Sequence, residues 1–186
     1  GFQSALMAPT EILAEQHYNT IYNILGNAPK PSVEKNWFSF YLDPISRPLS
    51  IGLLVGSQSK KEKQSIQELI SHNALDIVIG THALLQPSVE IPKLSLVIVD
   101  EQHRFGVMQR SSLRGKGKQP HLLVMSATPI PRSLALTLYG DLDLSVLDEL
   151  PNGRQPIETK WIHPDSRNNA YSFLRKQIAE GRQAFV

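Results

Sequence analysis

The chain has 186 residues, 41% of them hydrophobic and 19% charged, an ordinary globular balance that suits one α/β domain with some additional structure. The net charge of +2 is too small to indicate nucleic acid by itself, and the lack of cysteine excludes disulfides and thiolate metal sites. No apolar run approaches the roughly 18 residues that a membrane span needs, and the first residues do not resemble a signal peptide. We therefore expect a soluble, cytoplasmic protein that has no membrane partner.

The N-terminal residues predict a strand, a turn and a helix. Residues 4–7 form a short apolar run, and Thr10 can cap a helix that has Glu11 in its first turn. The apolar side chains of that helix recur on one face. His17 falls on the same face, so we interpret it as a packing residue. The hydroxyl in the Pro9-Thr10 turn could instead contact a phosphate, although helix caps are far commoner.

Residues 26–50 interrupt this pattern. They contain four prolines, which argue against a continuous helix or a central strand. They also contain an aromatic cluster, which argues against simple disorder: Trp37, Phe38, Phe40 and Tyr41. We expect an insertion that packs on itself as a small satellite core.

A second strand is predicted at residues 51–55, and it ends at Gly56-Ser57. Ser59 and Glu62 then have the spacing of a capping box, which predicts the start of a helix. The lysines in the first turns of this helix could face a phosphate, but lysines on an exposed face are usually only solvated.

Another strand of the kind that is buried in a sheet is predicted at residues 76–79, and Gly80, Thr81 and His82 follow it. A glycine lets the backbone approach a ligand closely, and the hydroxyl and amide that follow can bind a phosphate. The alternative is a tight turn from strand to helix, in which His82 only starts the helix.

The apolar run Leu96–Val99 predicts a strand that is buried on both faces, and it stops at Asp100 and Glu101. Ligands of open α/β sheets lie at the carboxyl edge of the strands, where such acids suit Mg²⁺ beside nucleotide phosphates. An ordinary exposed strand end is the alternative. Zinc binding by His103 is not expected, because no second histidine lies at helical ligand spacing from it.

The last part of the chain predicts one more strand of this domain and the start of another domain. Residues 121–125 read as a strand that leads into Ser126-Ala127-Thr128, whose hydroxyls could tie strand ends together or cap a helix. The turn residues at 148–154 are typical of a linker. Beyond the linker we expect strands at 157–162 and 183–186 and a helix at 168–180. The predicted domains are therefore 1–150 and 151–186.

Four segments, in this order, resemble motifs Ia, Ib, II and III of superfamily-two DNA helicases of the RecG type: Ala8–His17, Gly80–Leu84, Asp100–Val107 and Ser126–Arg132. The resemblance covers nearly the whole chain. It implies an α/β fold with a RecA-like parallel sheet and helices on both faces, as in a P-loop NTPase helicase core, followed by the start of a second RecA-like domain. The insertion at about 26–50 is longer than the connection usual in that family.

The resemblance also implies a role for each site residue. Asp100 holds Mg²⁺, and Glu101 orients and deprotonates the water that attacks the γ-phosphate of ATP. His103 contributes to the nucleotide site together with these two acids. Residues that couple the nucleotide and DNA sites are Gln102, His103, Ser126, Ala127 and Thr128. Residues that contact DNA are Pro9, Thr10, Gly56, Ser57, Gly80, Thr81 and His82.

The chain contains no G-x-x-x-x-G-K-S/T loop, which holds the phosphates of ATP. The resemblance places that loop upstream of Gly1 and the arginine finger of the second domain beyond Val186. We therefore expect a monomeric parent helicase or translocase that acts on branched DNA in recombination and repair. The isolated chain is expected to be inactive and to self-associate through exposed strand edges.

Alternative interpretations stay open. The nearest one is a transcription-repair coupling translocase of the Mfd type, which shares the mechanism and part of the motifs. A non-catalytic nucleic-acid-binding module is another, and it predicts salt-sensitive DNA binding that ignores nucleotide and magnesium. A helicase-like fold used only as a structural piece would bind no DNA.

Overall fold

The computed structural model describes residues 1–25, 32–34, 36–101, 116–117, 119–127, 143–149, 153–154 and 156–185, with the backbone alone for 32–34. Its internal contacts divide the chain into two units, 1–132 and 133–186, and each is described by itself. The domain boundary near 150 stays a prediction. None of the described helices is long and apolar enough to cross a membrane.

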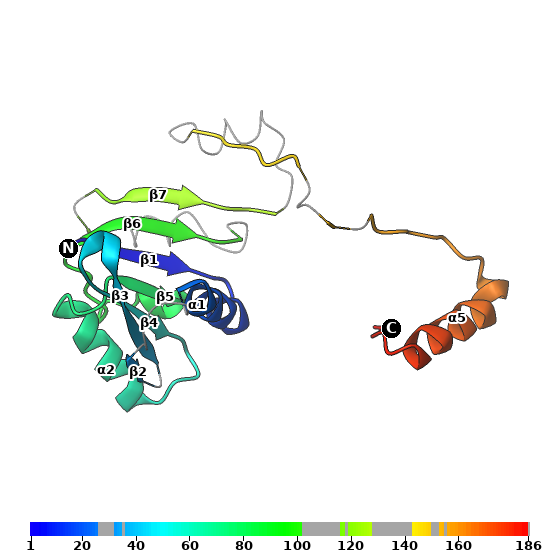
Figure 1. Cartoon of the computed structure of the whole chain (residues 1–186), viewed down its shortest axis with the longest axis horizontal. Helices are drawn as coiled ribbons and strands as arrows, with labels where there is room; N and C mark the ends of the chain where they lie inside the picture. Colours follow the sequence, from blue (N-terminus) through cyan, green and yellow to red (C-terminus); the bar gives the residue numbers. More distant parts are fainter. Residues whose placement is uncertain are drawn as a thin grey trace. The chain divides into compact units, whose positions relative to one another are not determined.

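Among the described residues, the first unit contains a seven-stranded sheet in the order β2-β3-β4-β5-β1-β6-β7. Its strands are β1 Gln3–Met7, β2 Ser32–Glu34, β3 Trp37–Leu42, β4 Arg47–Leu54, β5 Ile77–Gly80, β6 Leu94–Val99 and β7 His121–Val124. From β4 to β7 all neighbouring strands are parallel, and Figure 1 shows β1, β6 and β7 pointing the same way. This confirms the predicted RecA-like parallel sheet.

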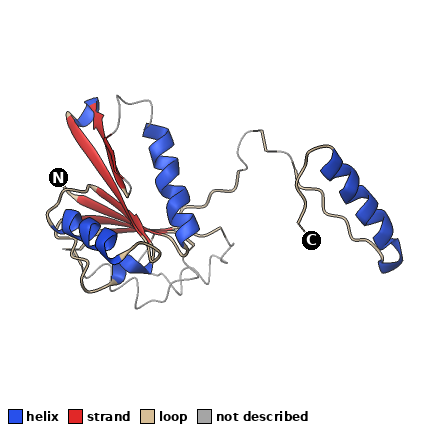
Figure 2. Ribbon diagram, turned by 90° about the horizontal axis from the view of Figure 1, so that it is seen from below, coloured by secondary structure: helices blue, strands red, loops and turns tan. Residues whose placement is uncertain are grey.

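Two helices cover opposite faces of this sheet: α1 Glu11–Leu25 and α2 Lys60–Ser71. Successive side chains of a strand point to opposite faces. In β1, Met7 belongs to the core cluster that contains Ile66 of α2, whereas Leu6 belongs to the cluster that contains Ala14 of α1. Helices on both faces were predicted, and the view along the sheet shows this layering (Figure 2).

Both predicted helix caps form. The Thr10 hydroxyl accepts a hydrogen bond from the Leu13 amide at 3.3 Å, at the start of α1. At the start of α2, the Ser59 hydroxyl accepts from the Glu62 amide at 3.3 Å, and the Glu62 carboxylate accepts from the Ser59 amide at 2.8 Å. This reciprocal capping box satisfies two backbone donors that a helix start leaves unpaired.

The insertion extends the main sheet, so the prediction of a separate satellite core is wrong. Its strand β3 pairs antiparallel with both β2 and β4, and the short 3-10 helix Asp43–Ile45 joins β3 to β4. The side chains of Phe38 and Phe40 are buried against α1. The ring centroid of Phe38 lies 4.7 Å from that of Tyr18. The aromatics thus complete the core between the sheet and α1.

The second unit contains the helix α5 Arg167–Ala179, preceded by the 3-10 helix Pro164–Ser166. The helix agrees with the prediction. The strands predicted at 157–162 and 183–186 are wrong for the described residues there, which end at Phe185 and are not in strands. A strand needs a neighbour to accept its hydrogen bonds, and none of the described residues of this unit supplies one.

Candidate active site

The carboxyl ends of five parallel strands bring the predicted site residues to one edge of the sheet. In sheet order, the segments that follow these strands are Gly56-Ser57 after β4, Gly80 to His82 at the end of β5, Pro9-Thr10 after β1, Asp100-Glu101 after β6 and Ser126-Ala127 after β7. The predicted DNA contacts therefore follow β4, β5 and β1, the predicted nucleotide residues follow β6, and the predicted coupling residues follow β7. Gln102, His103 and Thr128 lie outside the described residues.

Backbone hydrogen bonds hold these segments at the edge. The Asp100 amide donates to the Met7 carbonyl at 2.9 Å, and the Ala8 amide donates to the Gly80 carbonyl at 2.9 Å. The Met125 amide donates to the Val99 carbonyl at 2.8 Å. The ladders thus continue past the strand ends, so the side chains of Asp100 and its neighbours start from a fixed backbone.

Both carboxylate oxygens of Asp100 have a hydrogen-bond partner. Oδ1 accepts from the Glu101 amide at 2.9 Å, and Oδ2 lies 2.7 Å from Nε2 of His17 on α1. The side chains of His17 and Asp100 are 30% and 19% exposed. The interpretation of His17 as a packing residue is therefore wrong, because its ring reaches the acid at the end of β6.

Glu101 has a backbone conformation that residues other than glycine rarely adopt. Its φ angle is +48°, in the left-handed region that favours glycine. Such a conformation costs on the order of 1–3 kcal/mol for a non-glycine residue and is found most often at functional sites. The strain thus lies at the residue to which the family resemblance gives the role of general base.

The donor chemistry at the end of β6 fits magnesium better than zinc. The described part of the chain contains no group of three or more His, Asp or Glu residues placed to hold a metal ion. Mg²⁺ commonly uses one or two carboxylates and takes its other ligands from waters and substrate phosphates. The partly buried carboxylate of Asp100 at the sheet edge, with that of Glu101 beside it, fits this mode.

On the predicted DNA side, Glu11 joins two of the segments. Its Oε1 accepts a hydrogen bond from the Ser57 amide at 3.0 Å. A Cβ on Gly56 would lie 2.7 Å from the same oxygen, so glycine allows this approach. Lys63 of α2 donates to the Gly56 carbonyl at 2.5 Å. The sequence predicts only that Glu11 stabilises the start of its helix. No pattern in the sequence indicates its hydrogen bond to the segment after β4.

The Gly80-Thr81-His82 segment forms a tight turn, as the alternative interpretation predicted. A Cβ on Gly80 would lie 2.3 Å from the Leu54 carbonyl oxygen, so a side chain does not fit there. Thr81 is 1% exposed, and its hydroxyl has no hydrogen-bond partner among the described residues. His82 is exposed and begins the 3-10 helix His82–Leu85. The turn therefore presents His82 to solvent and keeps the Thr81 hydroxyl inside.

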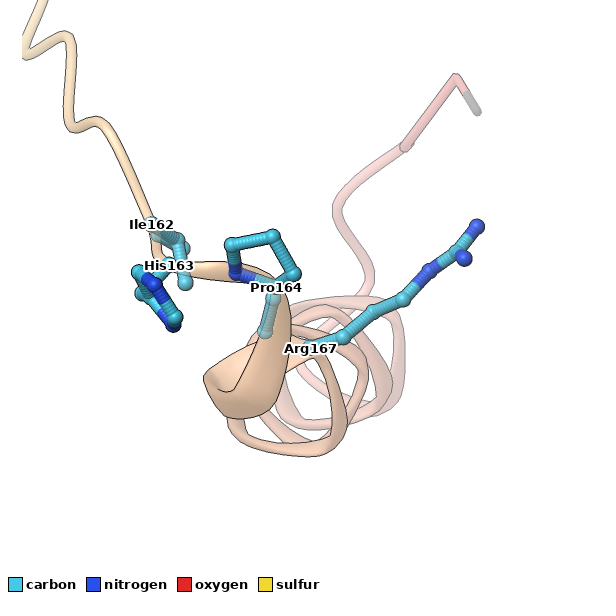
Figure 3. A pocket seen from close by; sticks show the side chains of 5 residues that line it. Ile162, His163, Pro164 and Arg167 are labelled. Carbon is cyan, nitrogen blue, oxygen red and sulfur yellow. The ribbon is translucent and has the colours of Figure 1, made fainter.

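The second unit has a shallow hollow of its own beside the start of α5. Figure 3 shows Ile162 and His163 at the end of an extended segment and Arg167 projecting from the helix start. Pro164 and Ala170 complete the lining. None of the predicted site residues lines this hollow.

Comparison with known proteins identifies the class. A family model described as DEAD/DEAH box helicase matches residues 1–137. The ATP-dependent DNA helicase RecG of Synechocystis sp. is 46% identical over 186 residues, which are 100% of this chain and 20% of that protein. RecG of Bacillus subtilis is 44% identical over 186 residues, which are 24% of its length. A solved structure of RecG bound to a three-way DNA junction matches 100% of this chain and 22% of its own, with 41% identity and a TM-score of 0.74.

The parallel sheet with acids at its carboxyl edge and the family match agree: the chain belongs to the DEAD/DEAH box helicase family. It spans about a fifth to a quarter of the length of the RecG relatives that it matches. Within the family it is of the RecG type, because the similarity to RecG proteins extends over the entire chain. The predicted resemblance is thereby confirmed.

Proposed function

We propose that the full-length protein containing this chain is an ATP-dependent DNA helicase or translocase that acts on branched DNA in recombination and repair. The observation that carries the proposal is the pair Asp100-Glu101, which the parallel sheet places at its carboxyl edge in a chain of the RecG type. The similar solved RecG is described as bound to a three-way DNA junction, which supports branched DNA as the substrate class.

The two acids take different roles in this proposal. Mg²⁺, when bound with ATP, neutralises the charge that develops on the phosphates during transfer. Asp100 holds the ion through its carboxylate, which the Glu101 amide and His17 keep in a fixed orientation. Glu101 orients the attacking water and accepts its proton. His103 contributes to the same nucleotide site.

The segments towards β4 carry the proposed DNA contacts. Pro9 and Thr10 precede α1, Gly56 and Ser57 follow β4, and Gly80, Thr81 and His82 form the turn at the end of β5. They contact the sugar-phosphate backbone of the DNA, which sets its position without reading its sequence. Thr81 is 1% exposed, so His82 rather than Thr81 presents its side chain at the turn after β5. Residues proposed to couple them to the nucleotide site are Gln102, His103, Ser126, Ala127 and Thr128.

The test is steady-state ATP hydrolysis by the full-length protein, with and without a three-way DNA junction, beside the Glu101→Gln variant. We expect stimulation by the junction, and a loss of roughly 100-fold or more in the variant, which is the usual contribution of a general base. A matched control is Gln64→Leu, which changes an exposed residue of α2. If neither protein hydrolyses ATP while both bind DNA, the proposal is wrong and a non-catalytic binding module replaces it.

A further inference from the structure

The contact between His17 and Asp100 joins two parts of the chain that are 83 residues apart, the helix α1 and the end of β6. The 2.7 Å between Nε2 and Oδ2 is a short hydrogen-bond distance. Both side chains are largely withdrawn from solvent, at 30% and 19% exposed. The geometry is therefore that of a specific contact rather than of a solvated surface pair.

The chemistry of the pair determines which atom donates. An Asp carboxylate has only acceptor sites, so the proton in this hydrogen bond belongs to Nε2 of His17. The other carboxylate oxygen accepts from the Glu101 backbone amide at 2.9 Å. The carboxylate is thus held from two directions, and rotation of its side chain would break both bonds. Each oxygen keeps a lone pair that points elsewhere.

We propose that His17 is a positioning residue for Asp100, and this rests on the proposed function of Asp100 in the nucleotide site. His17 fixes the orientation in which the carboxylate meets the magnesium ion or its water. Residues that orient a metal ligand in this way typically contribute 10-fold to 100-fold to metal affinity. His17 touches neither nucleotide nor DNA in this proposal.

The position of His17 on α1 gives the contact a second consequence. The helix begins directly after the Pro9-Thr10 turn, which is a proposed DNA contact, and His17 follows Thr10 by seven positions, about 10 Å along the axis. Helix α1 and His17 thus connect the Pro9-Thr10 turn to Asp100 through a continuous chain of bonded contacts.

Three variants of the full-length protein separate positioning from general structure. His17→Leu removes the donor, whereas His17→Gln keeps an N–H donor on a side chain of similar reach. Asn19→Leu is the matched control, because Asn19 is an exposed polar residue of the same helix. Thermal unfolding of each variant checks that the fold is retained.

The measurement is the equilibrium binding of a fluorescent ATP analogue as a function of Mg²⁺ concentration, without turnover. We expect the Mg²⁺ midpoint to rise about 10-fold in His17→Leu, to stay near the parent value in His17→Gln and to be unchanged in Asn19→Leu. In an Asp100→Asn background, His17→Leu should have no further effect, because the acid that it positions is gone.

The inference is overturned by an unchanged Mg²⁺ midpoint in His17→Leu, or by an equal rise of the midpoint in His17→Leu and His17→Gln. A rise in His17→Leu that persists unchanged in the Asp100→Asn background would also contradict it, because the effect would not pass through Asp100. The Glu101→Gln hydrolysis assay runs in parallel. Retained hydrolysis in Glu101→Gln refutes the assignment of the nucleotide site to the end of β6, on which this inference rests. An unchanged Mg²⁺ midpoint in His17→Leu, together with lost hydrolysis in Glu101→Gln, refutes the positioning role alone.

Discussion

Gln3 at the start of β1 is fully buried although it is polar. Its Nε2 donates to the carbonyl oxygens of Ile70 at 3.0 Å and Leu75 at 3.1 Å. Its Oε1 accepts from the Lys93 amide at 3.1 Å. One side chain thereby joins the end of α2, the segment before β5 and the segment before β6. We expect this cross-link to contribute strongly to the stability of the first unit.

The substitution Gln3→Leu keeps the approximate volume and removes all three bonds. The Ile70 carbonyl also accepts from the Asn73 amide at 3.0 Å, so the cost falls mainly on the Leu75 carbonyl and the Lys93 amide. A buried backbone group without a partner costs about 1–3 kcal/mol. With some of this offset by the added apolar burial, we expect the free energy of unfolding to fall by about 2–4 kcal/mol.

Urea unfolding followed by tryptophan fluorescence measures this change. Trp37 is partly buried in β3 and reports on the sheet, whereas Trp161 is 83% exposed and should contribute little. The control Gln64→Leu changes an exposed glutamine of α2 and should shift the free energy by no more than about 0.5 kcal/mol. If Gln3→Leu and Gln64→Leu unfold at the same urea concentration, the cross-link does not stabilise the unit as argued.

Two further predictions concern the turn after β5 and the aromatic core. Gly80→Ala would place a Cβ 2.3 Å from the Leu54 carbonyl oxygen, so β4 and β5 must separate. We expect the free energy of unfolding to fall by about 1–3 kcal/mol in the same assay. An unchanged urea midpoint would contradict the clash. Burial, with a smaller contribution from Tyr22, raises the pKa of Tyr18, so the folded state keeps the phenol proton longer than the unfolded state. The resulting stability is present below the ordinary tyrosine pKa of about 10 and is lost as pH rises through the folded-state value. Tyr18→Phe should therefore unfold with a weaker pH dependence above about pH 10, and equal slopes in the two proteins would refute this.

Local sequence patterns were sufficient for the parts of the fold that depend on local physics. The apolar run before Asp100 predicted a buried strand, and the Ser59 and Glu62 spacing predicted a capping box that forms as expected. The sequence also placed Asp100 and Glu101 at the carboxyl edge of the sheet, where ligands of open α/β sheets lie.

The features that the sequence did not reveal depend on strand order and packing. Periodicity placed His17 on the inner face of its helix, but it does not show that this face reaches the end of β6. That contact follows from β1 lying between β5 and β6. Proline content similarly suggested that residues 26–50 fold separately, whereas β3 pairs with β4 and its Phe38 and Phe40 pack on α1. The strand pattern at 157–162 has no neighbouring strand among the described residues of the second unit.

The most direct measurement is single-turnover hydrolysis of ATP by the full-length protein bound to a DNA junction, comparing the parent with its Glu101→Gln variant, beside the nucleotide affinity of each form. If Glu101 is the general base, Glu101→Gln should bind ATP within a few-fold of the parent and hydrolyse it at least roughly 100-fold more slowly. A variant that hydrolyses bound ATP at the parent rate would contradict the assignment of the catalytic site to the end of β6.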